Sequence, residues 1–136
     1  MDMRINACAL CKEVLFDKFS NTFSFIHVVE CVRPTQYPFS VSGLSLGLIL
    51  ACRKEIPALS LWVGCAPEGE NAAQLVRLQL RQLEVGLNKV HVKLGELPLA
   101  KPGWHDCTLI MDDGQGQRLA ATMTLFAEEP AHGVKP

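Results

Sequence analysis

Apolar and polar residues alternate along most of the chain with a period of two. The clearest rows of alternate positions are Leu44, Leu46, Leu48, Leu50 and Cys52; Leu59, Leu61, Val63 and Cys65; and His105, Cys107, Leu109 and Met111. Other rows are Phe23, Phe25, His27, Val29 and Cys31; Val90, Val92 and Leu94; and Leu119, Ala121, Met123 and Leu125. Successive side chains of a strand point to opposite faces, so each row predicts a strand with one face in a core.

Turn residues separate these rows. The strongest turn signal is Asp113-Gly114, because an Asp-Gly pair supplies the positive φ that a tight hairpin needs. Prolines at positions 34, 38, 57, 67, 98 and 102 mark other breaks. Many short strands with frequent turns predict an all-β fold, a two-sheet antiparallel β-sandwich of about seven to nine strands. We expect a single domain over residues 1–127 and a flexible tail over residues 128–136.

Residues 71–85 are compatible with two structures. Asn71 could cap a short helix, with Gln74 completing a capping box. The same segment could be a strand, because Val76, Leu78 and Leu80 alternate with polar residues. The neighbouring strands favour the strand, and one short helix within 71–85 is the alternative.

The composition supports a folded domain and excludes some partners. The chain has 136 residues, of which 49% are hydrophobic and 20% charged, so it can form a core without disulfides or zinc. Its net charge is -1. A nucleic-acid binder normally carries a basic excess, so we expect no nucleic-acid partner.

The sequence also indicates a compartment. The N-terminus lacks the pattern of a secretory signal, and the most apolar run, residues 44–52, is about half as long as a membrane helix. We therefore expect a cytoplasmic protein with no membrane partner. In that compartment the six cysteines remain free thiols that pack as small hydrophobes.

Several short stretches resemble a family of small bacterial proteins that carries only a domain-of-unknown-function label. They are Leu10-Cys11-Lys12-Glu13-Val14, Asp17-Lys18, Asn21, the strand at 23–29, Leu97-Pro98-Leu99, Pro102-Gly103-Trp104, the strand at 105–111 and Asp113-Gly114. Lys12-Glu13 stands where the family usually has an acid after the cysteine, and Ile26-His27 stands where it usually has Ile-Gly. The resemblance implies a cytoplasmic bacterial β-sandwich, and it implies no activity.

Cys8 and Cys11 have the C-x-x-C spacing of metal and redox sites. A zinc site needs two further ligands, and a redox pair of this kind precedes a helix. The sequence offers neither, because the other cysteines stand apart and no helical pattern follows Cys11. We interpret both as strand residues whose sulfurs lie on opposite faces.

Two other motifs suggest catalysis. Gly43-Leu44-Ser45-Leu46-Gly47 matches G-x-S-x-G, but a nucleophile elbow requires a strand, a sharp turn and a helix, and this motif lies within an alternating strand. His105, Asp106 and Cys107 supply an imidazole, a carboxylate and a thiol. Adjacent strand residues point apart, so we do not expect His105 to serve Cys107 as a base.

We interpret most of the remaining polar candidates as structural residues. We interpret His27 as a hydrogen-bonded core residue in its apolar row. Asp112 and Asp113 read as a hairpin turn and not as a calcium loop. Four basic residues lie in two neighbouring segments, Arg77 and Arg81 in one and Lys89 and Lys93 in the next. They could form one basic strip if both segments were strands of the same sheet.

Apolar residues on both faces of some strands point to an interface. Trp62 is out of phase with its row, Ile49 and Ala51 oppose the leucine row, and Ile26 and Val28 oppose the phenylalanine row. Since a sandwich has one core layer, we expect an apolar sheet face to mediate self-association, with a twofold homodimer as the default assembly.

The resulting functional hypothesis is a non-catalytic cytoplasmic interaction or assembly module, a homo-oligomer that could also bind another protein. It assigns no catalytic, cofactor-binding or metal-binding residue and no cofactor, and it leaves a small-molecule ligand open. The alternative is a small enzyme or metal-binding domain that uses Cys107 with a histidine, or Cys8 and Cys11.

Overall fold

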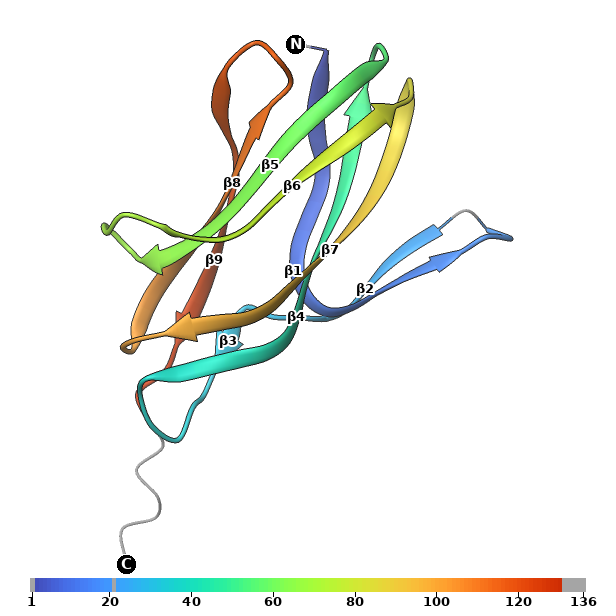
Figure 1. Ribbon diagram of the computed structural model, residues 1–136. Helices are drawn as coiled ribbons and strands as arrows, with labels where there is room; N and C mark the ends of the chain where they lie inside the picture. Colours follow the sequence, from blue (N-terminus) through green and yellow to red (C-terminus); the bar gives the residue numbers. More distant parts are fainter. Residues whose placement is uncertain (1, 21, 131–136) are drawn as a thin grey trace, which may run out of the picture.

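The computed structural model describes residues 2–20 and 22–130, apart from the side chains of residues 73–75. Its elements are β1 (Met3–Asp17), β2 (Thr22–Val28), β3 (Cys31–Val32), β4 (Phe39–Cys52), β5 (Ile56–Pro67), β6 (Ala73–Leu83), β7 (Gly86–Leu99), β8 (Gly103–Asp112) and β9 (Gln117–Ala127). This confirms the all-β prediction. The alternative of a short helix within 71–85 is wrong, since β6 occupies that segment and no helix occurs among the described residues (Figure 1).

The nine strands of the described chain form two sheets. One has four strands in the order β2-β1-β4-β7, and the other has five in the order β3-β9-β8-β5-β6. Neighbouring strands are antiparallel except β3 and β9, which pair in parallel through Cys31 and Val32. The fully antiparallel prediction is therefore wrong at this one short pair.

The core lies between the sheets and is built from the predicted rows. The leucine row of β4 and the row from Leu59 to Cys65 in β5 are buried throughout. The row from His105 to Met111 in β8 is buried as well. Alternation along these three central strands therefore identified the core correctly, because each strand turns one face toward the opposite sheet.

Other rows are interrupted by irregular pairing. An extra residue in β9, Ala120, lies opposite the step from Leu109 to Ile110, and Leu119 is 63% exposed as a result of the shifted register. His27 was predicted in the core but is exposed, with a positive φ of 52° that breaks the alternation of β2. Both predictions were wrong because a bulge or a left-handed residue moves the following side chains to the other face.

The first strand changes its pairing partner at Cys11. Residues from Met3 to Cys11 pair with β4, and residues from Cys11 to Asp17 pair with β2. Beyond Cys11, β1 and β2 form a two-stranded arm, residues 12–17 and 22–28, that leaves the body of the molecule (Figure 1).

The arm contacts the outer face of the four-stranded sheet, the face opposite the core. The ring of Phe25 lies directly over Gly47, where any Cβ would overlap it. The ammonium group of Lys89 in β7 lies 4.6 Å from the centre of the Phe16 ring. The four-stranded sheet is thus curled, and part of its outer face is covered by the chain itself.

The end of the described chain is tied to the loop before β4. The amide of Glu128 donates to the carbonyl of Val32, and the Tyr37 hydroxyl donates to the carbonyl of Glu128. The Glu128 carboxylate pairs with Arg33. Residues 131–136 of the expected tail, with His132, lie outside the described residues, as does Asn21, so the flexible tail stays a prediction.

No helix that could cross a membrane is found in the described ranges 2–20 and 22–130.

Replacing Gly47 with alanine should loosen the arm. The new Cβ would overlap the edge of the Phe25 ring, so we expect a loss of about 1–3 kcal/mol in the free energy of unfolding, measured in urea. The control is the same change in a Phe25→Ala background, where the ring is absent and the further loss should be below about 0.5 kcal/mol. Equal losses in both backgrounds would contradict this packing.

Candidate functional site

The arm and the curled sheet enclose a groove of about 580 Å³. The arm side contributes Lys12, Glu13, Val14 and His27, and the sheet side contributes Gly43, Leu44, Ser45, His91, Lys93 and Gly95. Its ionisable side chains are two lysines, two histidines and one glutamate, so the groove carries a positive balance. We call it the arm groove.

Ser45 and His91 meet in the arm groove. Ser45 Oγ and His91 Nε2 share a hydrogen bond of 2.9 Å, and Ser45 is 6% exposed. The register of β4 and β7 brings them together, because Ser45 lies opposite Lys93 and Gly47 lies opposite His91 on the same face. This contact was not predicted, because it depends on the register of strands that are far apart in the chain.

This pair lacks the other parts of a serine hydrolase site. A catalytic serine needs its histidine oriented by a third group and an oxyanion hole nearby. Among the described residues, no hydrogen bond joins His91 to a carboxylate. The G-x-S-x-G segment lies wholly within β4, and no helix follows it in the described part of the chain. The pair is a polar contact in the wall of the arm groove.

The lysines of the arm groove differ in their contacts. Lys12 Nζ donates to the carbonyl of Ser42 at 2.8 Å, which ties the base of the arm to β4. Lys93 is exposed on β7. The predicted basic strip does not form, because Arg77 and Arg81 lie on β6 in the five-stranded sheet, whereas Lys89 and Lys93 lie on β7 in the other.

Cys8 and Cys11 lie on opposite faces of β1. Cys8 is opposite Leu48 and packs against the core, whereas Cys11 is opposite Ser45 and fully buried on the other face. Burial raises the pKa of both thiols. In the described part of the chain, no three His, Cys, Asp or Glu side chains come together in a way that could hold a metal.

His105 and Cys107 lie on the same core-facing side of β8, because they are two residues apart. The prediction that the side chains of His105 and Cys107 point apart is therefore wrong, and only Asp106 points to the other face. His105 Nδ1 donates to the carbonyl of Gly103 at 3.0 Å, and its buried Nε2 has no hydrogen-bond partner among the described residues. Cys107 lies directly opposite Cys65 of β5.

The cysteines of β5 and β8 are neighbours in the core, on directly opposite residues of the two strands. The neighbouring Cys107 thiol lowers the pKa of Cys65, although burial opposes the effect. The neighbouring Cys65 thiol, together with burial, raises the pKa of Cys107. Sequence analysis gave no signal for the pair, since the two cysteines are far apart and only the register of their strands places them face to face.

The carboxylates of the aspartates at the β8–β9 turn accept hydrogen bonds from backbone amides of the same turn. Asp112 Oδ1 accepts from the amide of Gly114 at 2.8 Å, and Asp113 Oδ1 accepts from the amide of Gln115 at 3.1 Å. Arg118 pairs with the other oxygen of Asp113 at 3.3 Å. These contacts agree with the predicted hairpin turn.

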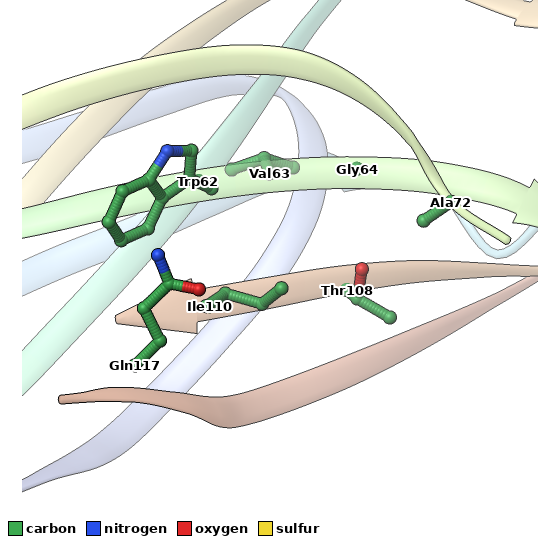
Figure 2. Close-up of a pocket in the computed structure, with 7 residues that line it drawn as sticks. All are labelled: Trp62, Val63, Gly64, Ala72, Thr108, Ile110 and Gln117. Carbon is green, nitrogen blue, oxygen red and sulfur yellow. The ribbon is translucent and has the colours of Figure 1, made fainter. Parts of the chain in front are cut away.

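A smaller hollow of about 270 Å³ lies on the outer face of the five-stranded sheet. Figure 2 shows the Gln117 side chain reaching toward the Trp62 indole, with Ile110 and Thr108 along the neighbouring strand. The guanidinium carbon of Arg77 lies 5.1 Å from the Trp62 ring centre, so a cation covers part of this apolar surface. Trp62 is therefore half-buried, with a charged group over its ring.

Comparison of the sequence with known protein families gives no match. A search among curated proteins also gives no match.

Thiol labelling of the native protein tests the placement of the cysteines. Cys31 is exposed, so an aromatic disulfide reagent should modify it fastest, whereas Cys11 and Cys107 should react only on unfolding. Changing Cys31 to serine should remove the fast phase and leave the slow ones. Fast native labelling of Cys11 or Cys107 would contradict the structure.

Proposed function

We propose that the protein is a non-catalytic, cytoplasmic assembly module in which two sheets form a sandwich and two copies associate through the free edge of β2. The observation that carries this proposal is the composition of that edge. Thr22–Val28 contains no lysine, arginine, acid or proline, and β2 is the outermost strand of its sheet.

The other outer strands carry the usual protection against edge-to-edge pairing. Charged side chains and prolines on an edge, or a very short edge strand, prevent another chain from adding to the sheet. β7 carries Lys89, Lys93 and Pro98, and β6 carries Arg77 and Arg81. β3 has only two residues. β2 has none of these features, so its unpaired backbone groups can accept another strand.

Exposed apolar side chains lie beside β2 on the arm. Leu15 and Phe16 are about half exposed, at 48% and 49%, and Phe19 at the tip is fully exposed. They border a hollow of about 570 Å³ that also includes Asp17 and Lys18, and Thr22 and Ser24 of β2. Such side chains near an open edge stabilise a strand pairing when a partner covers them.

The occupant that best fits this edge is a second copy of the same chain. A twofold axis beside β2 would pair it antiparallel with itself, and an isologous contact needs only one self-complementary patch. An uncharged strand meets its own copy without like-charge repulsion. The result would be one sheet of eight strands shared by two protomers.

A sheet-face interface, as expected from the sequence, has less support. The arm covers part of the outer face of the four-stranded sheet. The outer face of the five-stranded sheet carries apolar side chains, among them Trp62, Trp104 and Leu119, but charged and polar ones interrupt them; these are Ser60, Arg77, Gln79, Arg81, Thr108, Thr122 and Thr124. The edge of β2 is therefore a better candidate than either face.

A lysine on the β2 edge should prevent association. Ser24→Lys adds a charge that would meet its copy across the twofold axis, so we expect the dissociation constant to rise at least about tenfold, or about 1.4 kcal/mol. Sedimentation velocity over a range of micromolar concentrations measures the change. The matched control, Gln79→Lys, places the same charge on an exposed position of the β6 edge and should leave association unchanged.

Two outcomes would refute the edge-pairing proposal. One is a wild-type protein that remains a monomer across the concentration range. The other is a folded Ser24→Lys variant, judged by circular dichroism and urea unfolding, that associates as tightly as the wild type.

A further inference from the structure

Cys65 and Cys107 are unlike the other cysteines in their strand partners. They are each other's directly opposite residues in the antiparallel pair of β5 and β8. The residues opposite the remaining four are Leu48 for Cys8, Ser45 and Val28 for Cys11, Phe126 for Cys31, and Met3 and Gly86 for Cys52. In the described structure, only one pair of thiols is placed for direct reaction across a ladder.

The backbone spacing of this pair matches that of a disulfide. Directly opposite residues of antiparallel strands have Cα atoms about 4.5 or 5.5 Å apart, depending on the ladder position. Disulfides span Cα separations of about 4.4–6.8 Å. Both kinds of ladder position therefore satisfy the requirement, and both side chains belong to the same buried core cluster between the sheets.

We propose that Cys65 and Cys107 are an oxidisable dithiol that hydroperoxides convert into a cross-strand disulfide within the folded core. Cys65 is the thiol that reacts first. It retains 7% exposure, whereas Cys107 is completely buried, so Cys65 is the more accessible residue of the two.

The electrostatics of the pair agree with this order. The neighbouring Cys107 thiol lowers the pKa of Cys65, while the Cys65 thiol and burial raise the pKa of Cys107. The thiolate is the nucleophile in such reactions, so the more accessible sulfur is also the more reactive one.

The reaction is balanced in two steps. The Cys65 thiolate attacks the terminal oxygen of the hydroperoxide, the O–O bond breaks, and an alcohol or water leaves as Cys65 becomes a sulfenic acid. The sulfur of Cys107 then attacks the Cys65 sulfur, the S–O bond breaks, and water leaves with the Cys107 proton. The two sulfurs lose two electrons in total, and the peroxide gains them.

Hydrogen peroxide applied to the native full-length protein tests the proposal. Peptide mapping without reductant should recover the Cys65 peptide linked to the Cys107 peptide, and a thiol reductant should separate them. The near-ultraviolet circular dichroism should be retained, since the link forms without backbone movement. The midpoint of thermal unfolding should rise by on the order of 10 °C, because the link closes a long loop.

Two variants separate the roles of the cysteines. In Cys107→Ser, Cys65 should accumulate as a sulfenic acid that dimedone traps, because the resolving thiol is absent. In Cys65→Ser, Cys107 should stay reduced. Cys52→Ser is the matched control, since it removes another buried thiol from a strand of the core and should leave the Cys65–Cys107 link unchanged.

Three results would overturn the proposal. The first is native protein whose exposed Cys31 is oxidised by peroxide while Cys65 and Cys107 remain reduced. The second is a link that forms only in urea, which would mean that the folded register does not bring the sulfurs together. The third is equal trapping of sulfenic acid at Cys107 when Cys65 is replaced.

Discussion

The change of pairing partner at Cys11 is the constraint on which the rest of this structure depends. Up to that residue β1 is held by β4 within the body of the protein, and beyond it the strand is held only by β2. A two-stranded ribbon is marginally stable in water by itself. The arm therefore needs the contacts of Phe25 with Gly47 and of Phe16 with Lys89. The arm groove and the open β2 edge both follow from this geometry.

Alternation of apolar and polar residues correctly predicted the core faces of the strands that are regular. The rows in β4, β5 and β8 are continuous, so the position of one leucine determines the face of the next, and the core residues follow directly. The strand at residues 73–83 was also favoured correctly over a helix. Its helical features are local, whereas its pairing with β5 is a tertiary contact that overrides them.

The chemistry of the candidate sites could not be predicted in the same way. Ser45 meets His91, and Cys65 meets Cys107, through the registers of strands that are distant in the sequence. A shift of one residue in either register would point these side chains to opposite faces. His27 adds a second reason, because its left-handed backbone moves it from the expected core row to the rim of the arm groove.

Hydrogen exchange measured at several protein concentrations tests the central claim most directly. If the arm beyond Cys11 is supported on one side only and completed by a second copy, the amides of β2 should exchange much faster than those of β4 and β5 in dilute protein. Their protection should then increase with concentration while the core amides stay unchanged. Equal protection of β2 and the core at every concentration would contradict the account.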